Sequence, residues 1–508
     1  MDVPPTAPLP RLRLWLMHVA CVVSLAWPAL INGQPFYFPD TTAYVRAADI
    51  AVYMASGKRI STAWTEHYAD AVADLAVSRS ADTKSEGAAH GNDLGSGRIM
   101  AGRSPYFGAV LWVSYVVSLF WLFVVAQALV SYTLIRLSCR MLGLGGWRPV
   151  AVMVAILSLV TTLPFYVGLL MPDLLAAFAM LAFVLLAIDR GRLGRRERWA
   201  LGGLMMASAI SHLTHIWIVA AMAATLIVAR LWRGHGPQKD SASALISAAL
   251  AILLGLGSVA LTDSVVERQF GRAPQLVPLL TARFLADGPG RAYLRTHCPQ
   301  AGFAICAYRD RPPLSAPAFL WATAPGEGIY LLASPAERAA MASQDKAFAW
   351  AVIAAYPIEQ GAKILRNSGA QLIRFDSQLL NDHCNRPTPC GLALPDADRR
   401  RLMHSLGGRS LWPQRLITTI HYGAVGFALI MLAAWGVSMS RGRATNAERD
   451  LARWAGLIAI GMIINAMLGG AVSEVQTRYQ ARIIWLLPFV ATLAAMLWRQ
   501  RSASMIKR

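Results

Sequence analysis

Long apolar runs alternate with short polar segments along nearly the whole chain. A helix needs roughly 20 apolar residues to cross the hydrocarbon core of a bilayer, and most of these runs are close to that length. The pattern therefore predicts an all-α polytopic membrane protein with about ten transmembrane helices. The expected spans are residues 14–31, 106–137, 149–163, 172–188, two within 199–232, then 244–261, 416–439, 457–472 and 483–498.

Two of these runs allow a second interpretation. Residues 14–31 resemble a signal peptide, but the small-x-small triplet at 24–26 lies inside the apolar run and Trp27-Pro28 follows it, which favours an uncleaved span. Residues 199–232 are too long for one span, so we expect two helices that meet at the SHLTH segment. A single long helix would invert every later loop.

The charge distribution indicates the orientation. Only 15% of residues are charged and the formal net charge is +20, whereas soluble proteins carry roughly 25% charged residues. Basic residues gather in short loops such as DRGRLGRRER, as cytoplasmic loops do. We therefore expect a multi-pass protein of a bacterial inner membrane with both termini in the cytoplasm. Because no separate basic domain exists, we do not expect nucleic acid as a partner.

The polar segments divide the chain into three regions. Residues 1–261 would hold spans one to seven and a first outside loop, 33–105. Residues 262–412 would form an extracytoplasmic domain of mixed secondary structure, inserted between spans seven and eight. Residues 413–508 would hold the last three spans. About 150 residues are enough for a small domain with its own core.

Four of the six cysteines fall within residues 262–412. Their shared location predicts disulfides in an oxidising compartment. We expect the local pairs Cys298 with Cys306 and Cys384 with Cys390, and the sequence leaves crossed pairing open. Four ligands to zinc are the alternative, but the CxxC spacing typical of such sites is absent.

Acidic residues at the expected outside face are candidates for chemistry. Asp40 follows the first span in an aromatic segment that predicts an amphipathic helix, and its carboxylate is suited to act as a general base or to hold a metal or sugar. Asp173 begins the fourth span. For both residues the alternative is a structural role at a helix N-terminus, as a cap or beside the helix dipole.

A polar turn between the last two spans is the third candidate. Glu474, Arg478, Tyr479 and Arg482 crowd this turn, and arginines at an outside face run against the usual charge bias. A guanidinium fork binds phosphate well, whereas pairing with Glu474 is the structural alternative. His212 and His215, spaced for one helix face, would need a third partner to bind a metal, so interfacial polar histidines are the simpler interpretation.

Together these features resemble the membrane glycosyltransferases of the GT-C superfamily. The resemblance lies in the acid at Asp40, the second acid at Asp173, the apolar and basic pattern of 173–232, and the Arg478-Tyr479 element before the last span. The sequence departs from that group in two ways. Its large outside domain is inserted before the last spans, and Thr41 stands where many members have a second acid.

The resemblance implies transfer of a sugar from a polyprenyl-phosphate donor to a lipid or glycan acceptor. It implies that Asp40 acts as the base, that Asp173 orients the sugar or assists the base, and that the arginines neutralise the departing phosphate. The candidate substrate-binding residues are Tyr44, Glu474, Arg478, Tyr479 and Arg482. A divalent metal ion is a possible cofactor that the missing second acid puts in doubt.

Two other classes of protein share the expected topology. A polysaccharide polymerase or O-antigen-ligase-like enzyme would use basic groups of the large outside segment, and the candidates are Arg283, His297, Arg374 and His404. A transporter or flippase would usually show internal repeats or charges at mid-depth, whereas this sequence shows no repeat and its spans are nearly free of mid-depth charge.

Overall fold

The computed structural model describes most of the chain. The described residues are 11–68, 103–232, 239–271, 274, 276–312, 314–322, 324, 326–377, 380, 393–442 and 444–506. These residues form helices joined by turns and contain no strand, although Phe36 and Leu169 make one isolated β-bridge. The expected all-α class is confirmed. The mixed secondary structure expected for 262–412 is wrong for the described part of that segment, which is helical.

Six helical segments among the described residues are long and apolar enough to cross a membrane. They are α7 (Trp121–Met141), α12 (Leu213–Trp232), α13 (Lys239–Phe270), α21 (Gln414–Arg441), α22 (Asn446–Val472), and the run formed by α23 (Thr477–Ile484) and α24 (Leu486–Ile506). Shorter apolar helices accompany them: α1 (Arg11–Leu25), α6 (Pro105–Ser118), α8 (Trp147–Val160) and α10 (Leu174–Ala187). The chain is thus an integral membrane protein by composition, and the count of about ten spans stays a prediction.

Several helix boundaries differ from those the hydropathy pattern predicts. The run 106–137 is two helices, because the backbone takes the left-handed conformation at Leu119 (φ 51°) and Phe120 (φ 74°). The first apolar run breaks at Ala26, where α2 (Trp27–Asn32) begins with Pro28 in its first turn. The run 199–232 divides as expected, into α11 (Arg195–Ser211) and α12, which meet at His212.

Helix α10 forms the centre of the bundle. From Ala176 to Ala187 every residue is buried, and the helix packs against α7, α11, α12, α13, α22 and α23. A helix that is apolar on all sides belongs inside a bundle rather than at its surface. This placement fixes the position of Asp173, which precedes the helix.

A second group of helices has its own core. It comprises α14 (Leu279–Asp287), α15 (Pro289–His297), the 3-10 helix η1 (Ala304–Tyr308), α16 (Ala316–Trp321), α17 (Pro335–Ala355) and the start of α18 (Pro357–Ile373). Its buried side chains, such as Phe319 and Phe348, form a cluster separate from that of the bundle. Cys298 and Cys306 are disulfide-bonded, with Cα atoms 5.5 Å apart. The expected pair Cys384 and Cys390 lies outside the described residues.

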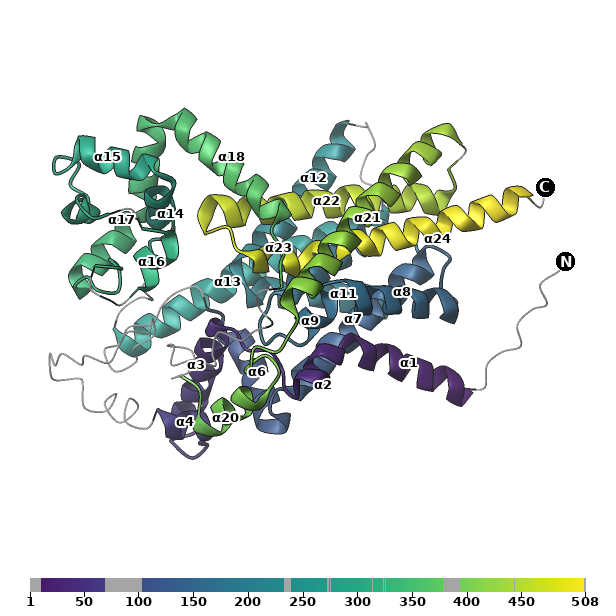
Figure 1. Cartoon of the computed structure of the whole chain (residues 1–508), viewed down its shortest axis with the longest axis horizontal. Coiled ribbons are helices and arrows are strands. Elements are labelled where there is room, and N and C mark those ends of the chain that lie inside the picture. Colours follow the sequence, from purple (N-terminus) through teal and green to yellow (C-terminus); the bar gives the residue numbers. More distant parts are fainter. Residues whose placement is uncertain are drawn as a thin grey trace.

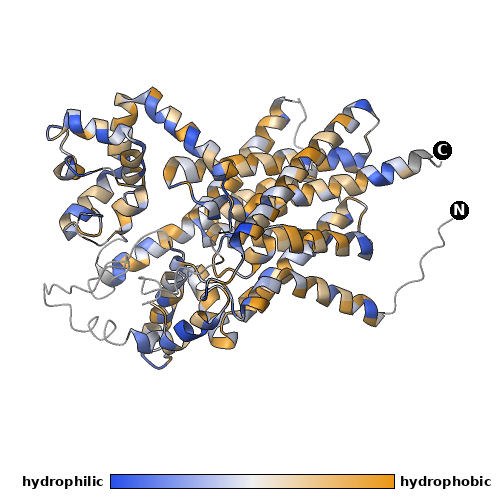
Figure 2. Cartoon of the chain, in the orientation of Figure 1, coloured by the Kyte–Doolittle hydropathy of each residue, from blue (hydrophilic) through white to orange (hydrophobic). Residues whose placement is uncertain are grey.

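The two ends of the bundle differ (Figure 1). One end holds the start of α1, the end of α24 and several ion pairs, in which Asp450 binds Arg190 (3.0 Å) and Arg192, Arg140 binds Glu197 (2.6 Å), and Arg501 binds Glu448 (3.3 Å). The other end carries α3 (Pro39–Ala55), α4 (Ala63–His67), α20 (Asp396–His404) and the separate group. Figure 2 shows that the ribbons between these ends are mainly hydrophobic.

A close contact between α3 and α6 gives a test of this packing. A Cβ atom at Gly108 would lie 2.5 Å from the backbone oxygen of Tyr44. We expect Gly108→Ala to lower the free energy of unfolding by about 1–3 kcal/mol, because neither backbone can yield easily. Gly257→Ala is the control, since nothing lies within 4 Å of that position. Thermal unfolding in detergent measures both, and equal melting temperatures would contradict the packing.

Candidate functional site

The segment before α3 is joined to the loop that precedes α10. Phe36 N donates to Gly168 O (2.9 Å), and Leu170 N donates to Phe36 O (3.0 Å). The Thr41 hydroxyl adds a bond to Leu170 O (3.0 Å). These three bonds pair polar backbone groups that would otherwise be buried without partners. They also bring Asp40 and Asp173, which are far apart in the sequence, to the same region.

Helix α7 supports the same loop from inside the bundle. The Gln127 amide nitrogen donates to Val167 O (3.0 Å) and lies near Leu169 O (3.3 Å) and Tyr166 O (3.4 Å). Gln127 is 3% exposed, so this amide replaces the water that would otherwise bind these carbonyls. The loop between α9 (Leu163–Val167) and α10 is therefore fixed on both sides.

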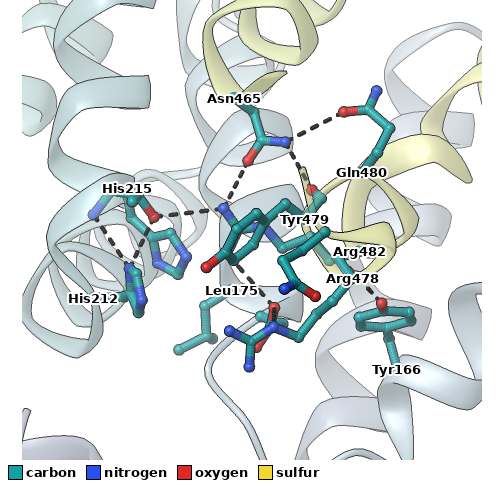
Figure 3. Close-up of polar contacts among 12 residues, drawn as sticks. Tyr166, Leu175, His212, His215, Asn465, Arg478, Tyr479, Gln480 and Arg482 are labelled. Carbon is teal, nitrogen blue, oxygen red and sulfur yellow. Dashed lines mark hydrogen bonds and ion pairs between the residues drawn. The ribbon is translucent and has the colours of Figure 1, made fainter. Parts of the chain in front are cut away.

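The short helix α23 carries the two arginines. The Tyr166 hydroxyl donates to Arg478 O (3.1 Å), the Thr162 hydroxyl to Ala481 O (2.6 Å), and the Asn465 amide to Tyr479 O (2.7 Å). Arg478 and Arg482 are four residues apart, so they point to one side of this helix. Figure 3 shows both arginines beside Tyr166 and Asn465.

Three guanidinium groups surround the two carboxylates. Arg103 Nη2 lies 2.6 Å from Asp40 Oδ1, and Arg478 Nη1 lies 3.5 Å from Asp40 Oδ2. Asp173 Oδ1 lies 3.8 Å from Arg478 Nε and 3.6 Å from Arg482 Nη1. Arg478 thus bridges both acids. The five formal charges leave one positive charge in excess.

The ion pairs around Asp173 are longer than hydrogen bonds. Asp173 Oδ1, Arg478 Nη1 and Arg482 Nε are buried, and none has a hydrogen-bond partner in the described structure. Most buried polar groups in proteins do have a partner, so unsatisfied donors at one place call for an explanation. A bound anion that accepts from Arg478 Nη1 and Arg482 Nε would satisfy these two donors.

Aromatic rings enclose the arginines. Arg478 Cζ lies 4.0 Å from the centroid of Phe38 and 5.2 Å from that of Tyr479, and Arg482 Cζ lies 5.5 Å from Tyr479. Such contacts stabilise a cation while leaving its N–H edge free for a ligand. Tyr44 is 1% exposed and packs edge-on against Phe107. Burial raises the pKa of the Tyr44 hydroxyl well above its ordinary value, so this group stays protonated.

The protonation state of Asp40 follows from its neighbours. Burial by itself would raise the pKa of this carboxyl. The positive charges of Arg103 and Arg478 outweigh that effect and hold the pKa below its ordinary value. Asp40 is therefore an anion at neutral pH. Its side chain keeps 22% of its surface exposed, so it can be approached from outside the protein.

Arg482 connects this site to the two histidines. Its Nη2 donates to Asn465 Oδ1 (2.6 Å) and lies 3.5 Å from Thr214 Oγ1. The rings of His212 and His215 lie 5.1 Å apart, but His212 Nδ1 contacts the Thr214 hydroxyl and His215 Nδ1 contacts the Ser208 hydroxyl. No group of three or more His, Cys, Asp or Glu residues suited to a metal ion occurs in the described chain.

The structure brings together most, but not all, of the residues that the sequence suggests. Asp40, Asp173, Arg478, Tyr479 and Arg482 form one cluster, with Tyr44 beside it. Glu474 is not part of it: its carboxylate accepts from the Gln476 amide (3.0 Å), and burial raises its pKa. The alternative pairing of Glu474 with Arg478 is therefore absent, and the acids that face Arg478 are Asp40 and Asp173.

The residues expected for a polymerase do not form a comparable cluster. Arg283 pairs with Asp287, and His297 stacks on Tyr293 with ring centroids 4.3 Å apart, both within the separate group of helices. His404 instead lies at the end of α20, and Arg374 follows α18.

Sequence reasoning missed three residues of the site. Arg103 pairs with Asp40, Asn465 binds Arg482, and Gln127 holds the loop. A polar side chain inside an apolar run marks both Gln127 and Asn465 as candidates, because such residues are costly in a membrane. No feature of the sequence around Arg103 pairs it with Asp40.

Comparison of this chain with protein-family models, with curated proteins and with solved structures finds no match.

The balance of buried charge gives a stability test. Asp173→Asn removes the acid that faces Arg478 and Arg482, and we expect it to lower the free energy of unfolding by about 3–5 kcal/mol because two buried guanidinium groups then lose compensation. Adding Arg482→Met should recover part of this loss, which a double-mutant cycle in detergent measures. Additive effects of the two substitutions would contradict the ion pair.

The pH dependence of stability gives a second test. Because the folded-state pKa of Asp40 is lowered, its contribution to stability is complete above the unfolded-state pKa of about 3.9 and is lost as the pH falls through the lower folded-state value. We expect the melting temperature of wild type to exceed that of Asp40→Asn by a constant difference between about pH 5 and pH 8. The margin should shrink below pH ~4. A margin that instead grows on acidification would show that the pKa is raised.

Proposed function

We propose that this chain is a membrane glycosyltransferase that moves a sugar from a polyprenyl-phosphate donor to a lipid or glycan acceptor at the outer face of the membrane. The observation that carries the proposal is the buried cluster in which Arg478 and Arg482 face Asp173, with Asp40 at its exposed edge. A cluster of carboxylates and guanidinium groups offers both a general base and donors for a phosphate, the two functions that sugar transfer needs.

The arginines are suited to hold the phosphate of the donor. Their unsatisfied N–H groups are fixed in place before a ligand arrives, since the backbone of α23 is bonded on both sides. Fixed donors stabilise charge that develops in a transition state without a cost of reorganisation. When the bond between the sugar and the phosphate breaks, the leaving oxygen gains negative charge, and the excess positive charge of the cluster favours that step.

Asp40 is suited to be the base. In an inverting transfer its carboxylate takes the proton of the acceptor hydroxyl, the hydroxyl oxygen attacks the anomeric carbon, and the polyprenyl phosphate leaves with its electron pair. With its pKa lowered by Arg103 and Arg478, Asp40 is a weak base in the resting protein. The negative charge of a phosphate bound beside Arg478 would offset this effect and raise the basicity of Asp40 when the donor is bound.

The charge pattern supports an orientation with this site outside the cytoplasm. The loop 189–198 and Arg140 lie at the end of the bundle where α1 begins and α24 ends. The site lies toward the opposite end (Figure 1). Basic loops face the cytoplasm in most membrane proteins. This orientation favours an inner membrane location with cytoplasmic termini and a lipid-linked donor.

Transfer assays on site variants test the proposal. With polyprenyl-phosphate sugars as donors and purified protein in detergent, we expect Asp40→Asn to lower the transfer rate about 10²–10⁴-fold, the usual effect of losing a general base. Arg478→Ala should lower the transfer rate by a similar factor. Asp310→Asn, at a carboxylate with a 90% exposed side chain, is the matched control and should leave the rate unchanged.

Native mass spectrometry of the purified protein separates the alternatives. A bound polyprenyl phosphate that Arg478→Ala loses, together with sugar transfer by wild type, is the expected result. Lipid binding without transfer under any donor would favour the flippase, and full activity of Asp40→Asn would favour the polymerase class.

A further inference from the structure

A cleft lies apart from the arginines of α23. It is formed between the end of α2 and the helix α20, and its volume is about 600 Å³. The residues lining it are Asn32, Gly33, Ala397, Arg400, Arg401, His404 and Ser405. The cleft is open to solvent, and Arg400, Arg401 and His404 are the basic residues that line it. No role proposed above uses it.

The walls of the cleft are rigid. The Asn32 side-chain oxygen accepts from Gly407 N (2.8 Å) and from the Trp412 indole (3.2 Å), which fastens the end of α2 to the turn after α20. Ser405 also caps this turn, accepting from Gly408 N (2.9 Å). Asn32 and Ser405 are buried and satisfied, so they shape the cleft and leave its binding chemistry to the basic residues.

The charges of α20 leave two basic groups available. Asp398 is buried, binds Arg401 and accepts from the Tyr115 hydroxyl (3.1 Å), while Asp396 binds Arg399 (3.0 Å). Both acids of the helix are therefore occupied. Arg400 and His404 are four residues apart and face the cleft from one side of the helix.

The cleft lies at the level where the apolar helices end. Asn32 follows the first apolar run, in which Leu30 and Ile31 are 48% and 59% exposed, and the span α21 begins shortly after α20. Met403 and Leu411 are also more than half exposed beside the basic residues. In Figure 2 the ribbon of α20 is largely blue. Basic groups bordered by exposed apolar side chains are the pattern of a membrane–water interface.

From this arrangement we propose that the cleft binds the phosphate of an anionic membrane lipid. Arg400 donates to the phosphate oxygens as a fork, His404 contributes a second contact, and the acyl chains lie against Leu30, Ile31 and Met403. The site would hold α20, and with it the connection from the outside segment into α21, against the bilayer surface. It does not depend on the proposed sugar transfer.

Lipid binding to the full-length protein tests this site. By native mass spectrometry and thermal shift in detergent, we expect phosphatidylglycerol to bind more tightly than zwitterionic phosphatidylcholine. The double variant Arg400→Ala/His404→Ala should lose about tenfold in phosphatidylglycerol affinity, as removal of a charge-assisted contact does. Arg399→Ala is the matched control, because it removes a charge from the same helix without lining the cleft, and its affinity should change less than about twofold.

Three results would overturn the proposal. The first is equal binding of the two lipids by wild type, and the second is unchanged phosphatidylglycerol affinity in the double variant. The third is full displacement of the lipid by millimolar inorganic phosphate, which would mean that the cleft recognises the free ion rather than a lipid. Because Arg400 and His404 are exposed, the double variant should melt near wild type, and that measurement confirms its fold.

Discussion

The position of Arg478 between Asp40 and Asp173 is the constraint on which the rest of the site depends. A buried guanidinium is costly unless acids face it, and a buried carboxylate is equally costly alone. One arginine here serves two acids that come from different helices, so α3, α10 and α23 must meet at one point. The β-bridge at Phe36, the Gln127 amide and the Tyr166 hydroxyl are the means by which the backbone keeps them there.

This arrangement places charged side chains inside an otherwise apolar bundle. The arginines are supported by rings and by Asn465 instead of by fully formed hydrogen bonds to Asp173. The chain therefore holds its charges in place without using all their hydrogen-bonding capacity. Such incomplete satisfaction is expensive for stability, and it is the property that a site for a phosphorylated ligand requires. The separate lipid cleft at α20 follows a different principle, because its basic groups remain exposed and its acids are already paired.

The sequence predicted the helical class and the candidate charges better than it predicted their supports. The length of the apolar runs predicted the long apolar helices, and the rule that charge in a membrane is costly singled out Asp173, Arg478 and Arg482. It could not show that Arg103 faces Asp40, since 62 residues separate them and nothing local links the two. It also missed the break at Leu119, because an unbroken apolar run carries no sign of a left-handed turn. The helical nature of the described part of 262–412 was missed because short amphipathic helices and strands are alike over a few residues.

Leu119 and Phe120, the two residues with left-handed backbone between α6 and α7, affect the orientation of the helices that carry the site. Non-glycine residues in this conformation cost about 1–3 kcal/mol each, so the surrounding contacts must impose the bend. Phe120 is held by Tyr37 and Tyr115, with ring centroids 5.8 Å and 5.0 Å away. Since α6 packs on α3 through the contact at Gly108, these torsion angles contribute to the position of α3, and with it of Asp40, together with the bonds from Phe36 and Thr41 to the loop before α10. The corner at Leu119 and Phe120 thus helps to orient α3, and a substitution there would shift Asp40 although neither residue belongs to the charged cluster.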